Sequence, residues 1–232
     1  ARLCHAGVAM KVSENLSVQL LRYDYPAPRF TSYPTAPIFR SNFPETSYQH
    51  LLSECGKRQT PLSLYFHLPF CSSICYFCAC NVIYTANRRR AEPYLELLKL
   101  EMDLVRRYLK TPAPVRQLHL GGGTPTFFNA TQITQLMHSV RELFEIESDA
   151  ELSIELDPRV TDGDHVRALA EAGFRRASLG VQDLSADVQA AIHRVQPFEM
   201  TRDLIQDLRE NSFEGVNIDL LYGLPRQTRA GF

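Results

Sequence analysis

The sequence has no excess of either charge and no long apolar run. Its 25 Lys and Arg residues nearly balance its 26 Asp and Glu residues, which leaves a formal net charge of -1 at pH 7. A chain with this balance has no general field that attracts nucleic acid or anionic lipid. No apolar stretch approaches the roughly 20 residues that cross a membrane, and no secretory signal opens the sequence. We therefore expect a cytoplasmic protein that acts on a small molecule, without nucleic acid or a membrane as partner.

Cysteine is scarce outside one short segment. Of the six cysteines, Cys4 and Cys55 are isolated, whereas the other four lie between Cys71 and Cys80. A cytosolic chain of 232 residues has reduced thiols and needs no disulfide framework. A structural zinc site usually draws on two separated pairs of ligands, and this sequence has no second pair. A zinc-stabilised binding module is therefore only a minor alternative.

The pattern of apolar residues changes near residue 60. Residues 1–60 show little periodicity and contain scattered prolines and aromatics, which predicts an irregular N-terminal arm. Residues 1–9, which precede Met10, are expected not to belong to the native arm. From residue 61 to residue 232, short apolar runs alternate with helical patterns, as in β/α units around a parallel sheet. The expected strands are 62–67, 115–120, 151–156, 176–181 and 216–221, and the expected helices are 92–109, 130–144, 162–172, 185–192 and 198–211.

Each expected strand ends near polar or glycine residues. Five such strands are compatible with an open doubly wound sheet or with a (β/α) barrel, and both bind ligands at the carboxyl ends of their strands. We therefore expect these ends to line one concave face. The residues concerned are Tyr65, His67, Gly121, Gly122, Gly123, Glu155, Asp157, Gln182, Asp183, Asn217 and Asp219.

A cysteine-rich segment follows the first expected strand directly. Cys71, Cys75 and Cys78 have the spacing C-x₃-C-x₂-C, and Cys80 comes two residues later. Thiolates bind soft metals, and a compact loop with three or four of them can hold an inorganic core. The glycine run 121–123 ends the second expected strand, where a backbone without side chains can approach a ligand closely. Together the two segments predict a metal core beside a bound small molecule.

The cysteine spacing in a β/α domain resembles that of the radical S-adenosylmethionine (SAM) superfamily. The resemblance implies an α/β fold, a partial (β/α) barrel that stops after about five strands. It also implies an oxygen-sensitive [4Fe–4S] cluster on Cys71, Cys75 and Cys78, with the fourth iron open to the methionine part of SAM. An electron passed into the sulfonium then releases a 5′-deoxyadenosyl radical, while the protein binds, orients and excludes solvent. Cys80 is expected to stay off the cluster.

Further segments are similar to the oxygen-independent coproporphyrinogen III oxidases of haem biosynthesis, from about residue 23 onward. Related haem chaperones share the cysteine loop and the glycine run, and they form the second interpretation. They typically have Asp-Phe where this chain has Ala79 and Cys80, and they lack the arm around residues 30–35. Ala79 also departs from the glycine usual in the oxidases. The matching segments are YPT at 33–35, HLPFC at 67–71, CYFCACN at 75–81, GGGTPT at 121–126, SIELDPR at 153–159, GVQD at 180–183 and NIDLLYGLP at 217–225.

This second resemblance implies radical oxidative decarboxylation of coproporphyrinogen III to protoporphyrinogen IX. It implies two SAM molecules, an external electron donor and acceptor of unknown identity, and a monomer at full length. Because family members are about twice as long, it also implies that this chain lacks later strands and is inactive alone. The SAM on the cluster would contact Tyr65, Gly122 and Glu155, and the second SAM would contact Phe77, Ala79, Gly123, Thr124, Gln182, Arg194 and Asp219.

Overall fold

Five parallel strands form a single open sheet in the computed structural model, which describes residues 38–232. The chain divides into two units, Ala1–Pro44 and Glu45–Phe232, and the sheet belongs to the second. The strand order follows the chain order, β1-β4-β5-β6-β7, so β1 and β7 are the edges and no closed barrel forms. The expected α/β class with five strands is confirmed. The strands are β1 (Leu62–Leu68), β4 (Pro114–Gly122), β5 (Glu145–Leu156), β6 (Arg176–Gln182) and β7 (Gly215–Leu220).

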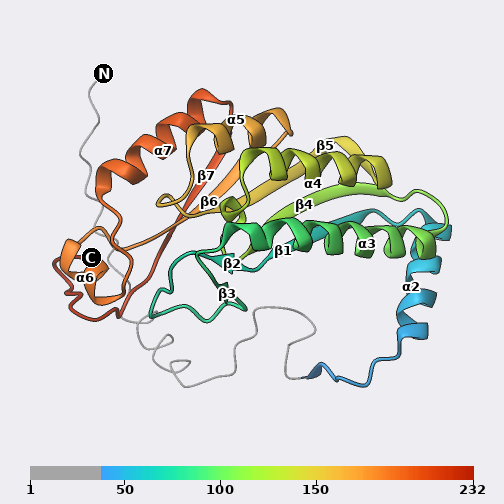
Figure 1. Cartoon of the computed structure of the whole chain (residues 1–232), viewed down its shortest axis with the longest axis horizontal. Helices are drawn as coiled ribbons and strands as arrows, with labels where there is room; N and C mark the ends of the chain where they lie inside the picture. The colour runs from blue at the N-terminus through green and yellow to red at the C-terminus, as the bar shows by residue number, and fades with distance from the viewer. Residues whose placement is uncertain (1–37) are drawn as a thin grey trace, which may run out of the picture. The chain divides into compact units, whose positions relative to one another are not determined.

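Helices connect the successive strands, and all of them except the short α6 (Ala186–Ala191) lie along one side of the sheet (Figure 1). Right-handed crossovers between parallel strands taken in chain order place the covering helices on the same face. All five expected helices are present within one residue of their predicted bounds. None of the helices within residues 38–232 combines the length and apolar character needed to cross a membrane. The helices are α3 (Ala91–Leu109), α4 (Ala130–Leu143), α5 (Gly163–Glu171), α6 (Ala186–Ala191) and α7 (Phe198–Glu210).

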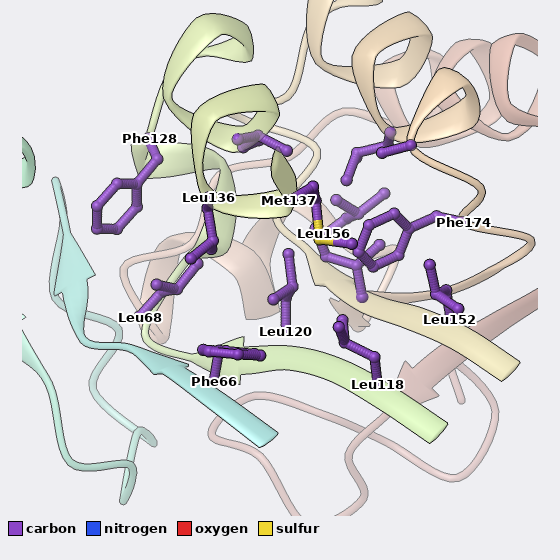
Figure 2. Packing of buried hydrophobic residues seen from close by; sticks show 14 of the residues in the cluster. Phe66, Leu68, Leu118, Leu120, Phe128, Leu136, Met137, Leu152, Leu156 and Phe174 are labelled. Atoms are coloured by element: carbon purple, nitrogen blue, oxygen red, sulfur yellow. The ribbon is translucent and has the colours of Figure 1, made fainter. Parts of the chain in front are cut away.

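Alternation along the strands separates an apolar face from a polar one. Leu118 and Leu120 of β4 are fully buried, and Figure 2 shows them directed toward Met137 of α4. His119, between them in the sequence, lies on the opposite face because successive side chains of a strand alternate. The apolar face therefore packs against the helices, and the polar face is left for other groups. Other core residues in Figure 2 are Phe66, Leu68, Phe128, Leu136, Leu152, Leu156 and Phe174.

Side-chain caps define the ends of α4 and α5. The Asn129 side chain accepts from the Gln132 N–H at 2.9 Å, and the Gln132 side chain accepts from the Asn129 N–H at 3.0 Å. Asp162 accepts from the His165 N–H at 3.1 Å in the same way. Each pair satisfies donors that a helix start leaves free. Gly173, just after α5, has φ +92°, the left-handed conformation in which glycine commonly ends a helix.

Two parts of the fold differ from the sequence prediction. A helix, α2 (Glu45–Arg58), occupies the end of the stretch 1–60 that we expected to be irregular. It packs on α3 through Leu52 and Cys55, and at Gly56 a Cβ atom would lie 1.8 Å from the Leu109 carbonyl oxygen. The helix buries so few apolar residues that its periodicity is weak. The rest of the predicted arm, residues 1–37, lies outside the described residues.

The second difference concerns strands. Strand β5 begins at Glu145, six residues before its expected start, because Glu145 and Ile146 already pair with β4 before an irregularity in the register. Polar residues fill the part between that irregularity and the apolar run, so alternation gives no signal there. A small parallel pair, β2 (Phe70–Cys71) and β3 (Ile83–Tyr84), was also not predicted, since each strand has only two residues.

Replacing Leu120 by Ala should lower the free energy of unfolding by about 2–5 kcal/mol, because the change leaves a cavity at the centre of the sheet. That loss is a large part of a total of roughly 5–15 kcal/mol. Urea unfolding followed by circular dichroism measures it. The matched control is Leu97→Ala on α3, whose side chain is 61% exposed and whose replacement should change stability by less than about 0.5 kcal/mol. Equal losses in both variants would contradict the location of the core.

Candidate functional site

A cavity of about 240 Å³ lies at the carboxyl ends of the strands, against the cysteine-rich loop. The loop and the ends of β4, β5, β6 and β7 supply its lining. The structure therefore brings together residues that are distant in sequence, as the strand-end argument predicts. The predicted site residues that line the cavity are Cys71, Cys75, Phe77, Cys78, Gly122, Gly123, Thr124, Glu155, Gln182, Arg194 and Asp219.

Tyr65 and Ala79 are the two predicted site residues that do not line this cavity. Ala79 is exposed on the cysteine-rich loop, so its contact with a ligand stays a prediction. Tyr65 lies beside the cavity wall, since a Cβ atom at Gly121 would be 3.0 Å from the Tyr65 ring and 3.1 Å from the Glu155 carboxyl carbon. Tyr65 thus belongs to the group of side chains around Glu155.

Backbone hydrogen bonds close the cysteine-rich loop at its base. The Ile83 N–H donates to the Pro69 carbonyl at 2.7 Å, and the Thr85 N–H donates to the Cys71 carbonyl at 2.9 Å. These bonds extend the β2–β3 pair, which joins the two ends of the loop. At the far end of the loop, the His67 Nε2 atom lies 2.8 Å from the Asn81 carbonyl oxygen. The loop therefore has a fixed place relative to β1.

The glycine run brings the end of β4 into direct contact with the same loop. The Gly123 N–H donates to the Leu68 carbonyl at 2.9 Å, and a Cβ atom at Gly123 would lie only 2.6 Å from the Pro69 carbonyl oxygen. Gly122 has φ +122°, a conformation that favours glycine, and a Cβ there would be 2.9 Å from the His67 ring. One wall of the cavity is consequently bare backbone.

The predicted cluster ligands have three different environments. The Cys71 sulfur lies 3.3 Å from the Thr124 hydroxyl, and burial raises the pKa of the Cys71 thiol. Cys75 is buried, and its sulfur accepts from two guanidinium groups. Cys78 is exposed and lies near Cys80. Burial, together with the neighbouring Cys78, raises the pKa of Cys80 to about 11, which keeps Cys80 a neutral thiol at pH 7.

The donor set fits an iron–sulfur cluster. The cavity is lined by soft sulfur donors, the ligand type that such clusters take. Within residues 38–232, no three Cys, His, Asp or Glu side chains converge on the position of a single metal ion. Cys71, Cys75 and Cys78 all line the same cavity.

A buried ionic network lies behind Cys75. Arg159 donates to Asp157 from Nη2 at 2.6 Å and from Nε at 2.9 Å, and Arg194 Nη1 donates to the same carboxylate at 3.1 Å. Burial opposes the charge on Asp157, but the hydrogen bonds of Arg159 and the charges of both arginines outweigh it and hold the pKa of Asp157 below its usual value. For Arg159 too, burial opposes the charge, and the Asp157 carboxylate more than compensates by raising its pKa.

Glu155 is the carboxylate that remains open to a ligand. Its Oε2 atom accepts from the Gly122 N–H at 3.1 Å, and its Oε1 atom lies 3.6 Å from His119 Nε2. Burial favours the neutral acid, but the nearby His119 ring and the hydrogen bond from the Gly122 N–H outweigh burial and lower the pKa of Glu155 below its ordinary value. The Tyr65 ring stacks on His119 with centroids 5.9 Å apart. Glu155 is therefore held ionised at neutral pH.

Strands β6 and β7 contribute the remaining predicted residues. Gln182 is buried with φ +70°, at the point where the register between β6 and β7 shifts. Asp219 accepts from the Asn217 amide at 2.8 Å and lines the cavity. Asp183 does not line it, because its carboxylate accepts from the Ser185 N–H and the Gln227 side chain at 2.7 and 2.6 Å. Asp183 thus has a structural role.

Comparison with known proteins gives a family for this arrangement. The model of the radical SAM superfamily matches residues 65–232, which is more than half of the chain and includes the cysteine loop, the glycine run and every strand end described above. The chain belongs to the radical SAM superfamily. Membership implies a [4Fe–4S] cluster and SAM as cofactors, and the sulfur-lined cavity of this radical SAM domain fits the first of them.

Individual relatives are more similar still. The radical SAM chain is 46% identical over 214 residues to the oxygen-independent coproporphyrinogen III oxidase of Helicobacter pylori strain J99, covering 91% of this chain and 47% of that protein. The Escherichia coli K12 protein of the same name is 45% identical over 212 residues, with 91% and 46% coverage. A solved structure of coproporphyrinogen III oxidase from Escherichia coli, described as a radical SAM enzyme, matches with a TM-score of 0.84 at 42% identity, over 93% of this chain and 48% of that one. The chain spans about half the length of the curated relatives it matches.

The sequence analysis missed two residues of the site. His119 lies between two core leucines, and its partners Ser153 and Glu155 are on the neighbouring strand. Arg159 stands in the segment 153–159 used for the resemblance, but nothing in the sequence connects it with Cys75, 84 residues away. The Asp-Pro-Arg segment after β5 was the only signal for Arg159, and polarity on a core strand was the only signal for His119.

Changing Cys71, Cys75 or Cys78 to Ala should each abolish the visible absorbance of the reconstituted iron–sulfur cluster, since each removes one of three thiolate ligands. Cys80→Ala is the matched control in the same loop, and it should retain both the absorbance and the iron and sulfide content. Anaerobic reconstitution followed by spectroscopy and an iron count measures both. Loss of the cluster in Cys80→Ala would show that Cys80 is a fourth ligand and that no iron is left open for SAM.

Proposed function

We propose that this chain carries the cluster-binding and SAM-binding half of an oxygen-independent coproporphyrinogen III oxidase. The observation that supports this most is the match to the coproporphyrinogen III oxidase structure, with a TM-score of 0.84 at 42% identity, over the part that contains the sulfur-lined cavity. The reaction converts two propionate groups of coproporphyrinogen III into the vinyl groups of protoporphyrinogen IX. This reaction is a step of anaerobic haem biosynthesis.

The chemistry needs an electron, SAM and a terminal electron acceptor. A cluster held by Cys71, Cys75 and Cys78 would supply the electron that cleaves bound SAM, and the 5′-deoxyadenosyl radical formed in this way would take a hydrogen atom from the β-carbon of a propionate. The carboxyl group then leaves as carbon dioxide, and an external acceptor takes the one remaining electron. The chain's own residues bind and orient these molecules and exclude water from them. We also propose that the full-length protein is a cytoplasmic monomer served by an external electron donor.

Two SAM molecules share the site in this proposal. The ionised Glu155 carboxylate and the backbone of Gly122 would bind the first, with Tyr65 beside them. Gly123, Thr124, Phe77, Ala79, Gln182, Arg194 and Asp219 would bind the second. Eight of these ten residues line one cavity, all but Tyr65 and Ala79, and this supports the assignment. Arg194 Nε is a buried donor without a partner among the described residues, and a ligand carboxylate would satisfy it.

Glu155→Gln should weaken SAM binding by about tenfold or more, because a hydrogen bond to a charged group contributes roughly 1.5–3 kcal/mol. The variant keeps the size of the side chain and removes its charge. Equilibrium dialysis with labelled SAM on the reconstituted chain gives the dissociation constant. Glu145→Gln, at the start of the same strand and exposed, is the control and should leave binding unchanged. Unchanged binding in Glu155→Gln would remove Glu155 from the SAM site.

The decisive assay uses the full-length polypeptide that contains this sequence. Incubated anaerobically with coproporphyrinogen III, SAM and a reductant, it should release carbon dioxide and form 5′-deoxyadenosine and protoporphyrinogen IX, detected by liquid chromatography and mass spectrometry. Omission of SAM and the Cys75→Ala variant of that polypeptide are the controls. Stoichiometric haem binding without carbon dioxide release would favour the haem chaperone instead. Absence of both 5′-deoxyadenosine and protoporphyrinogen IX would refute the oxidase.

A further inference from the structure

The network behind Cys75 carries a fixed positive charge. Arg159 and Arg194 share one carboxylate, Asp157, and the three side chains are 16%, 7% and 10% exposed. Arginine stays protonated in proteins, and the two guanidinium groups hold Asp157 ionised. The charges of the three side chains therefore add up to one net positive charge in the interior of the protein. A buried charge of this kind requires a counter-charge nearby.

Besides the Asp157 carboxylate, the two arginines share a second acceptor, the sulfur of Cys75. Arg159 Nη2 lies 3.4 Å from it, and Arg194 Nη1 lies 3.5 Å from it. As a cluster ligand, Cys75 would supply the negative charge that balances the network. The other two predicted ligands differ, because the Cys71 sulfur lies 3.3 Å from the neutral Thr124 hydroxyl and, among the described residues, no charged side chain donates to Cys78. The charged donors are thus concentrated on one ligand of three.

The backbone holds Arg159 in this position. The Asp157 carboxylate accepts from the Arg159 N–H at 3.0 Å as well as from its guanidinium, and the Asp157 carbonyl accepts from the Val160 N–H at 3.1 Å. Pro158, between them, restricts φ. Arg194 is fixed independently, since its Nη2 donates to the Gly180 carbonyl at 2.6 Å. The two guanidinium groups are therefore held at Cys75 by separate supports, Asp157 just after β5 and Gly180 of β6.

We propose that Arg159, acting with Arg194, stabilises negative charge on the Cys75 sulfur and so makes the bound cluster easier to reduce. The proposal rests on the cluster site of the proposed function, and it assigns to Arg159 a role separate from SAM binding. Reduction adds one electron to the cluster, and hydrogen bonds and charges at the ligand sulfurs set its potential. Arg159 acts through the Cys75 sulfur and contacts no reacting atom, so it is a positioning residue and not a catalytic one.

The test is a redox titration of the reconstituted 232-residue chain without SAM, with the reduced cluster quantified by electron paramagnetic resonance. Arg159→Gln removes the charge and should lower the ratio of reduced to oxidised cluster at a fixed potential by about tenfold, or roughly 59 mV for one electron. Arg159→Lys keeps the charge and should show a smaller loss. Arg167→Gln, an exposed arginine of α5 that pairs with Asp164, is the control and should behave as wild type.

Asp157→Asn supplies a change of opposite sign. It keeps both guanidinium groups and removes a negative charge, so the cluster should become easier to reduce. A general structural defect would not shift the reduction potential in opposite directions when neighbouring residues of one network are changed. If one of the two variants fails to hold iron, the other still tests the proposal. Unchanged potentials in the variants, with full iron content, would refute the proposal and leave the proposed function standing. A wild-type chain that binds no cluster would overturn both.

Discussion

Backbone contact between the glycine run and the base of the cysteine loop holds the site together. The Gly123 and Thr124 N–H groups donate to the Leu68 and Phe70 carbonyls, both at 2.9 Å, just before the first cysteine. Glycine at 123 is the only residue that permits this approach, because a Cβ would lie 2.6 Å from a carbonyl oxygen. Strands β1 and β4 are adjacent in the sheet, so the contact continues their pairing beyond the strand ends. The positions of the cysteines, and of everything that faces them, depend on it.

The second constraint is the one-sided core. Strands of a parallel sheet are normally covered on both faces and read as continuous apolar runs. Here the strands alternate, and only the face toward α3, α4, α5 and α7 is apolar. The other face carries polar side chains such as Tyr65, His119 and Glu155, which contact one another across β1, β4 and β5. The same alternation that builds the core therefore prepares a polar surface next to the cavity.

Local patterns made most of the fold predictable. Helix bounds followed from the periodicity of apolar residues, a signal that acts within a few residues of the sequence. Strands shorter than three residues and the weakly apolar helix α2 carry no such local signal. In the site, the cysteine spacing and the glycine run could be recognised because each lies within one short segment of the sequence. The contacts of Arg159 and Arg194 with Cys75 join residues 84 and 119 positions apart, and only the folded sheet brings them together.

Two carboxylates on the same strand end show how position divides their chemistry. Glu155 and Asp157 both have a lowered pKa and are ionised at neutral pH, although burial opposes the charge in each. The Asp157 carboxylate accepts hydrogen bonds from two arginines and is almost fully buried. The Glu155 side chain is 48% exposed, and its partners are one backbone N–H and a histidine at 3.6 Å. Asp157 lies just beyond the end of β5, two residues after Glu155, and is the more deeply buried of the two. The inner carboxylate fixes charge around Cys75, and the outer one keeps acceptor capacity for a cation that enters the cavity.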